Sequence, residues 1–254
     1  MEINKGALSV KRARRATRTD PEELRAFLAA PHAAAAPLAR WLNTSPRFAA
    51  FAGEYRDKIR KKLRTAADAD GLRDVLCELE TAYQLLDEPR LTLEYEASPQ
   101  RQTRTPDFSL TYRSRTLCHV EAARLRGPTT PGMERLHEVI CGKLGQMLPG
   151  AMNVLVIATA TALPQAAECE RALQQLQVRA ERGDAQVLER YHFEKRADFF
   201  RFYTRLSAVV LRNSGDAAAP VPAVLCLNKP ARHLLPVPLA RALRTVFTPA
   251  ATAP

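Results

Sequence analysis

The chain has 254 residues, with 38 Lys and Arg against 27 Asp and Glu, which gives a formal net charge of +11. This length is enough to bury a sizeable core, and a composition of 46% hydrophobic and 26% charged residues argues against a disordered chain. No apolar run approaches the roughly 18 residues that a transmembrane helix needs, which excludes a membrane-spanning protein. The first 64 residues hold 15 basic and 6 acidic residues. This uneven charge favours a polyanionic partner, above all nucleic acid, over the alternative of a merely solvated basic face.

The cysteines are five in number, widely scattered and without a CxxC pair, so they read as reduced structural residues. They are Cys77, Cys118, Cys141, Cys169 and Cys226. The N-terminal sequence lacks the apolar stretch of a secretory signal. We therefore expect a cytoplasmic protein.

The N-terminal quarter is predicted to contain a basic arm and a helical extension. Residues 1–19 have almost no large apolar side chain, which predicts a flexible arm. Residues 20–69 predict helices over 20–30, 38–42 and 48–64, the last with an apolar stripe opposite a basic side. The expected nucleic-acid contacts of these two segments are Lys11, Arg12, Arg14, Arg15, Lys58, Lys61 and Lys62.

Residues 70–254 alternate between helical and strand patterns, which predicts one α/β domain with helices on both sides of a mixed sheet. The expected helices cover about 70–87, 132–148, 164–188, 195–206 and 239–246. The expected strands cover about 91–96, 106–112, 116–123, 153–160, 206–213 and 222–228. The strand at 153–160 is nearly all apolar, which indicates a central position covered on both faces.

Two carboxylates in the predicted hairpin carry the first functional signal. Asp107 heads one strand and Glu121 lies in its hairpin partner, so pairing would bring them together at one end of the sheet. Strand alternation places His119 on the same face as Glu121, where the ring would touch substrate or simply be hydrogen bonded. Carboxylate oxygens of this kind bind Mg²⁺ or Mn²⁺, which promotes phosphodiester hydrolysis.

The order of these motifs resembles the core of the PD-(D/E)xK nuclease superfamily. The resemblance covers about residues 72–160: ELETAYQLL is similar to the acidic first helix, TPDF to the ProAsp motif, and HVEAA to the (D/E)xK strand. The later segment LCLNKPA is similar to the strand exit found in such proteins. The resemblance implies a restriction-endonuclease-like mixed central sheet flanked by helices, and a metal-dependent nuclease.

The chain departs from the superfamily at the motif lysine, whose place is taken by Ala123. Arg124 is adjacent, but alternation points it to the opposite face. Lys143 on the following helix is the better substitute, with Gln146 three residues on and therefore on the same helical face. The plain alternative is that Lys143 is an ordinary surface lysine.

For the acid of the first helix there are two candidates. Glu78 shares a stripe with apolar residues, whereas Glu80 lies on a more polar side of the predicted helix. Glu78 is therefore expected to join Asp107 and Glu121 as a metal ligand, unless it lies at the helix edge.

The leading hypothesis is a nuclease-like protein that binds nucleic acid, with DNA favoured, and hydrolyses phosphodiesters with Mg²⁺ or Mn²⁺. Its catalytic residues would be Asp107, Glu121, Lys143 and Gln146. The alternative is a catalytically inactive nuclease fold that binds nucleic acid or a protein partner, which the missing motif lysine favours. A third reading is a scaffold with no nucleic-acid role. The oligomeric state stays open, a homodimer included.

Overall fold

The computed structural model describes residues 32–97, 105–127, 132–214 and 222–248. The basic arm and the helix expected over 20–30 lie outside these residues. The chain divides into two compact units, residues 1–60 and 61–254, and each is described by itself. Within the described ranges, no helix combines the length and the apolar character that crossing a bilayer requires.

The first unit is helical in its described part, with α2 (His32–Thr44), α3 (Pro46–Glu54) and the beginning of α4 (Arg56–Thr65). The single helix expected over 48–64 is wrong, because the backbone at Tyr55, with φ −103° and ψ 18°, separates α3 from α4. Helix α2 is longer than expected and continues through Pro37. The buried side chains of this unit include Ala34, Leu38, Trp41, Leu42, Phe48 and Phe51.

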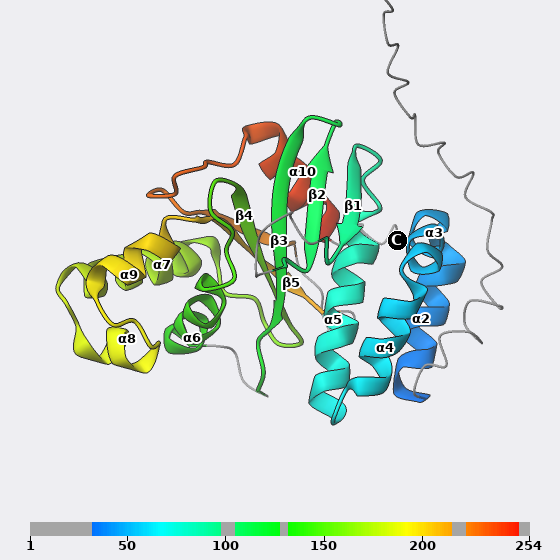
Figure 1. Cartoon of the computed structure of the whole chain (residues 1–254), viewed down its shortest axis with the longest axis horizontal. Helices are drawn as coiled ribbons and strands as arrows, with labels where there is room; N and C mark the ends of the chain where they lie inside the picture. Colours follow the sequence, from blue (N-terminus) through cyan, green and yellow to red (C-terminus); the bar gives the residue numbers. More distant parts are fainter. Residues whose placement is uncertain (1–31, 98–104, 128–131, 215–221, 249–254) are drawn as a thin grey trace, which may run out of the picture. The chain divides into compact units, whose positions relative to one another are not determined.

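The second unit is built on a six-stranded sheet in the order β1-β2-β3-β4-β5-β6 (Figure 1). The strands are β1 (Leu91–Tyr95), β2 (Phe108–Tyr112), β3 (Thr116–Arg124), β4 (Met152–Thr159), β5 (Leu206–Asn213) and β6 (Val224–Leu227). Strands β3, β4 and β5 are parallel, and the other neighbours are antiparallel. The expectation of an α/β fold with a mixed sheet flanked by helices is confirmed.

The helices of this unit are α5 (Ala69–Leu85), α6 (Met133–Leu144), α7 (Ala166–Glu181), α8 (Ala185–Arg190), α9 (Arg196–Tyr203) and α10 (Val237–Phe247). Buried residues of α6, α7 and α9 form one core cluster with Leu155 and Ile157 of β4. The alternate β4 residues Val154 and Val156 are equally buried, so the other face is also covered. Figure 1 shows α6–α9 to the left of the sheet and α5 to its right.

A buried ion pair joins α5 to β5. Arg212 is fully buried, and its Nη1 donates to Glu80 Oε2 at 2.8 Å while its Nη2 donates to Thr81 Oγ1 at 3.0 Å. The expectation that Glu80 lies on a more polar side of its helix is therefore wrong, because the carboxylate turns inward to meet a buried cation. This pairing commits Glu80 to the core.

Candidate active site

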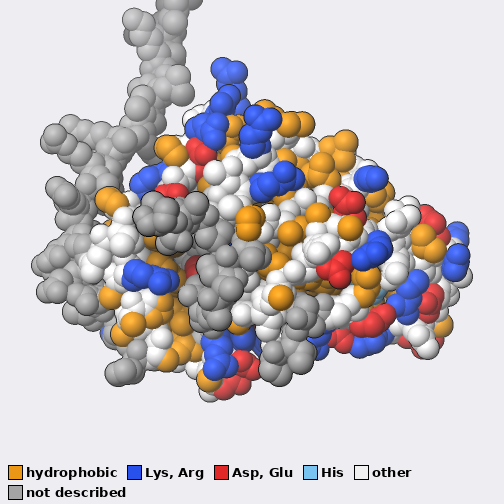
Figure 2. Space-filling model, turned by 180° about the vertical axis from the view of Figure 1, so that it is seen from behind, with side chains coloured by type: hydrophobic (Ala, Val, Ile, Leu, Met, Phe, Trp, Pro, Cys, Tyr) orange, Lys and Arg blue, Asp and Glu red, His pale blue; other side chains and the backbone are white. Residues whose placement is uncertain are grey.

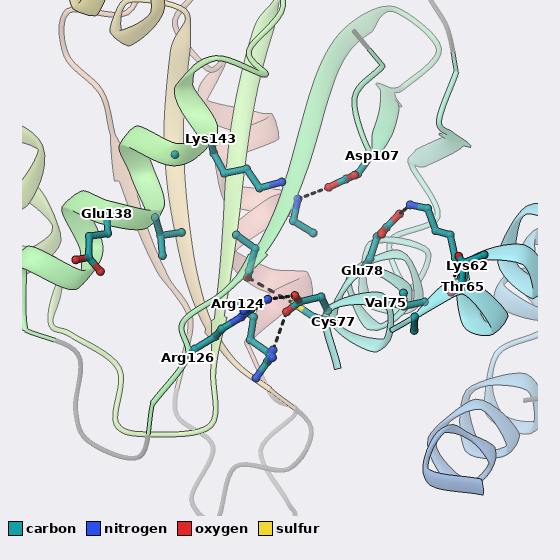
Figure 3. Close-up of a pocket in the computed structure, with 16 residues that line it drawn as sticks. Lys62, Thr65, Val75, Cys77, Glu78, Asp107, Arg124, Arg126, Glu138 and Lys143 are labelled. Atoms are coloured by element: carbon teal, nitrogen blue, oxygen red, sulfur yellow. Dashed lines mark hydrogen bonds and ion pairs between the residues drawn. The ribbon is translucent and has the colours of Figure 1, made fainter. Parts of the chain in front are cut away.

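A cleft of about 570 Å³ lies beside the C-terminal half of β3, with α5 on one wall and α6 on the other. Its lining residues from these elements and their neighbours are Lys62, Thr65, Ala66, Asp74, Val75, Cys77, Glu78, Asp107, Ala122, Ala123, Arg124, Arg126, Glu138, Val139, Gly142 and Lys143 (Figure 3). In open α/β sheets, ligands bind at the carboxyl ends of the parallel strands. The cleft occupies that position for β3.

Asp107 stands at the edge of the cleft, immediately before β2. Its Oδ2 accepts a hydrogen bond from the backbone N–H of Ala122 at 2.8 Å. At this end of the β2–β3 ladder, Phe108 pairs with Val120. Continuing the register by one residue places Asp107 opposite Glu121. The strand pairing and the side-chain hydrogen bond together place Asp107 next to Glu121.

Glu121 is 4% exposed and projects from β3 toward α6. Its Oε2 lies 3.3 Å from Lys143 Nζ, and its Oε1 is buried with no hydrogen-bond partner among the residues that the structure describes. Burial and the neighbouring charge of Asp107 raise the pKa of Glu121 to about 7, although Lys143 and the backbone N–H of Asp107 oppose the rise. Glu121 thus has a buried oxygen without a hydrogen-bond partner in the described part of the chain and lies beside a second carboxylate. This arrangement favours the binding of a cation.

Lys143 reaches Glu121 from the last turn of α6. Its Nζ also donates to Gln146 Oε1 at 2.7 Å, so the two residues lie together as their spacing predicts. Figure 3 shows the Lys143 and Asp107 side chains pointing toward one another. Ala123, at the motif position of the lysine, contributes only a methyl group to the cleft. Lys143 therefore supplies a cation beside Glu121, where β3 has only the methyl group of Ala123.

Glu78 lies on the opposite wall of the cleft and is already paired. Its Oε1 accepts from Lys62 Nζ at 2.6 Å. Burial and the charge of Asp107 raise the pKa of Glu78 to about 7, whereas Lys62 and the hydroxyl of Tyr95 oppose the rise. The charge of Asp107 thus raises the pKa of both glutamates. Glu121 itself is not among the residues that line the cleft.

The position of Lys62 differs from the solvent-facing surface on which the helical pattern places it. Its Nζ is bound by Glu78 at 2.6 Å and by Glu96 at 2.8 Å, and it lies 5.0 Å from the centre of the Tyr95 ring. Burial alone would lower the pKa of Lys62, but the two glutamates raise it above its ordinary value. Lys62 thus lines the cleft, whereas Lys58 and Lys61 are exposed. The basic residues expected at positions 11, 12, 14 and 15 lie outside the described residues.

Two arginines that the sequence pattern did not assign to the site border the other end of the cleft. Arg124 Nε donates to Asp74 Oδ1 at 3.0 Å, and Arg126 also pairs with Asp74. Arg124 reaches α5, on the side of the sheet opposite Glu121, as strand alternation predicts. Nothing in the local sequence of Arg126 indicates this position, because it depends on how α5 packs.

His119 is occupied by a neighbouring side chain on the sheet. Its Nδ1 lies 3.1 Å from Ser109 Oγ, and both residues are 7% exposed. Burial lowers the pKa of His119. His119 is therefore a hydrogen-bonded residue outside the cleft lining.

The described residues offer two carboxylates, and no third protein ligand, to a small oxygen-binding cation. Across the described ranges, no group of three or more His, Cys, Asp and Glu is arranged to hold a metal ion. Asp107 and Glu121 supply two adjacent carboxylates, one with an orphaned buried oxygen. Mg²⁺ is commonly held by one or two carboxylates with water and substrate phosphate completing the shell, so this pair fits it. Comparison with protein-family models, with curated proteins and with solved structures gives no match to this chain.

Proposed function

We propose that the chain hydrolyses phosphodiester bonds of nucleic acid at this cleft, as a divergent relative of the PD-(D/E)xK nucleases. The observation that carries the proposal is the placement of Asp107 beside Glu121, with Lys143 in contact with Glu121. Adjacent carboxylates and a lysine next to a solvent-accessible cleft are the parts that metal-assisted hydrolysis uses. The net charge of +11 favours a polyanionic substrate, with DNA as the first choice.

Asp107 and Glu121 are the residues that would hold Mg²⁺ or Mn²⁺. When bound, such an ion polarises a phosphodiester and lowers the pKa of a bound water. Glu78 already pairs through its Oε1 with Lys62 at 2.6 Å. We therefore assign Glu78 to positioning Lys62 rather than to the metal.

Lys143 and Lys62 would act from opposite walls of the cleft. Lys143 would hold the attacking water or stabilise the charge that develops on the phosphate, with Gln146 fixing the ammonium group. Lys62, fixed by Glu78 and Glu96, would contact a substrate phosphate. Because both ammonium groups are already held in place, little side-chain freedom would be lost when the substrate binds.

One observation favours a second candidate function, a catalytically silent module that binds nucleic acid or a protein. Ala123 lines the cleft where the related nucleases carry their lysine, and a methyl group neither orients nor activates water. This candidate keeps the cleft as a binding site and assigns no chemistry to Asp107 and Glu121.

A cleavage assay separates the two candidates. Purified chain is incubated with single-stranded DNA, duplex DNA and RNA, with Mg²⁺, with Mn²⁺ or with EDTA. The proposal predicts metal-dependent cleavage that is abolished by Asp107→Asn and by Glu121→Gln but retained by Glu138→Gln. Glu138 is the matched control, because it lines the same cleft but pairs with Arg135 and Arg190. No cleavage of any substrate, or equal activity in Asp107→Asn, would overturn the proposal.

A further inference from the structure

The edge of the sheet opposite the cleft carries basic side chains from two distant segments. The turn between β2 and β3 brings Arg113 and Arg115, and the loop after β6 brings Lys229 and Arg232; all four are exposed. Strands β3, β4 and β5 begin at this edge and antiparallel β6 ends there, so the register brings both segments to the same side. Figure 1 shows this turn and this loop at the upper side of the view, and Figure 2 shows Lys and Arg side chains gathered at the top of the molecule.

None of these four side chains forms an ion pair with a carboxylate in the part of the chain that the structure describes. Arg113 instead lies over the Tyr112 ring, 5.3 Å from its centre. Arg124 of the cleft and Arg179 of α7 behave differently, since each of them contacts a carboxylate. Four exposed cations that pair with no described carboxylate are available to an external anion.

The β2–β3 turn adopts a backbone that its residues disfavour. Arg113 and Ser114 both have positive φ, of 50° and 57°, and the turn is closed by a hydrogen bond from Arg115 N to Tyr112 O at 3.2 Å. Gly, Asn and Asp are the residues that suit such a turn. An arginine in this conformation costs stability relative to those residues, which points to a role for its side chain outside the fold.

The loop after β6 is held at a fixed position. Asn228 is 1% exposed, and its Nδ2 donates to Tyr203 O and Leu206 O, both at 2.9 Å. The backbone N–H of Arg232 donates to Thr204 O at 2.8 Å. The loop therefore presents Lys229 and Arg232 from a fixed backbone, which lowers the entropic cost of binding.

We propose that Arg113, Arg115, Lys229 and Arg232 form a second nucleic-acid contact, which binds the phosphate backbone at the sheet edge away from the cleft. The two pairs stand about three strand spacings apart, on the order of 14 Å. That span covers about four successive phosphates of one duplex strand, at roughly 3.4 Å of helix rise for each. The choice of nucleic acid among polyanions rests on the proposed function; the cationic surface itself does not.

The test uses variants that remove charge without harming the turn. Arg113→Asn suits a positive φ, so Arg113→Asn combined with Arg232→Gln should fold with an unchanged or higher melting temperature. The matched control is Arg171→Gln with Arg182→Gln, which removes the same charge from exposed positions on and just after α7. Circular dichroism melts of both double variants come first.

Binding is then measured in EDTA by fluorescence anisotropy with a 20-base-pair labelled duplex over a range of salt concentrations. The inference predicts that Arg113→Asn with Arg232→Gln weakens binding on the order of tenfold and flattens the log–log salt slope by about 1.8, at about 0.9 for each phosphate contact. The control should keep both affinity and slope. Equal weakening in the two variants would overturn the inference, since net charge alone would then explain it.

Two further arms fix the identity of the partner. Vesicles of phosphatidylserine and phosphatidylcholine, and a polyglutamate peptide, replace the duplex. Binding of either that depends on Arg113 and Arg232, with duplex binding unaffected by them, would overturn the assignment to nucleic acid. If the wild-type chain binds through this edge but cleaves nothing, the inference stands and the proposed hydrolysis is refuted. If the chain cleaves nucleic acid but Arg113→Asn with Arg232→Gln leaves the salt slope unchanged, the proposed hydrolysis stands and the inference is refuted.

Discussion

Lys143 Nζ lies 3.3 Å from Glu121 Oε2, although the two residues belong to different elements and are 22 positions apart. The same ammonium donates to Gln146 Oε1 at 2.7 Å, which fixes it from a second direction. The cation that β3 lacks at Ala123 thus reaches Glu121 from the end of α6. This contact supports the proposed hydrolysis despite Ala123 at the motif position.

Removal of the Lys143 ammonium should slow cleavage without abolishing it. We expect Lys143→Ala to lower kcat by about 10² to 10³, the range typical of a lost proton-transfer or charge-stabilising group, with a smaller change in KM. Gln146→Ala should cost less, since it only orients the lysine. Single-turnover cleavage assays of both variants measure this. A rise in KM with kcat unchanged would show that Lys143 only binds substrate, and full activity in Lys143→Ala would remove Lys143 from the site.

The raised pKa of Glu121 predicts that stability depends on pH. Its folded value of about 7 lies above its ordinary 4.5, so the folded state retains the proton more strongly and unfolding becomes easier as pH rises from about 4.5 to 7. Glu121→Gln removes the buried charge and should raise the melting temperature at pH 8 by roughly 2–4 °C, about 1 kcal/mol, with no gain at pH 4.5. Thermal melts of Glu121→Gln and of the wild type between pH 4.5 and pH 8 test this prediction. A variant less stable than wild type at pH 8 would contradict the account.

The buried pair of Arg212 and Glu80 should be costly to break. Glu80→Gln leaves the Arg212 charge buried and unpaired, so we expect a loss of about 3–5 kcal/mol in the free energy of unfolding. Asp198→Asn, which breaks the exposed pair with Arg201, should cost less than about 1 kcal/mol. Urea denaturation of both variants gives the comparison. Similar losses in the two variants would show that the burial of Arg212 does not set the cost of breaking its ion pair.

The basic arm should contribute to affinity by charge alone. Residues 1–18 carry six basic residues and one acidic residue. A chain that begins at residue 19 should bind duplex DNA more weakly and with a flatter salt dependence, by about 0.9 in the log–log slope for each lost phosphate contact. Anisotropy titrations from 50 to 300 mM salt measure the slope. Unchanged binding at low salt would exclude the arm from recognition.

Periodicity predicts much of the second unit, but the single helix expected over 164–188 is wrong, because Gly183, with φ 68°, separates α7 from α8. The hairpin of β2 and β3 and the apolar strand β4 lie within about two residues of their expected positions. In the first unit, the same apolar stripe suits one long helix or two short ones. The break at Tyr55 follows Gly53 by two residues, but a single glycine inside a helical pattern is tolerated and does not by itself announce a break.

The candidate site is predictable where its parts share a hairpin or a helical spacing, as Lys143 and Gln146 do. Asp107 and Glu121 come together through strand pairing, which the sequence indicates. The partners of Glu78 and Glu80 come from α4 and β5, and no local pattern specifies them: Lys62 reads as part of a solvated basic face, and Arg212 as an ordinary strand residue. Both positions follow from how α5 packs against the rest of the unit.

If Asp107 and Glu121 form a cation site, calorimetric titration with Mn²⁺ should detect it. We expect one ion bound per wild-type chain, with affinity lowered at least tenfold by Asp107→Asn and by Glu121→Gln and unchanged by Glu138→Gln. No Mn²⁺ binding by the wild-type chain, or equal affinity in Asp107→Asn, would contradict it.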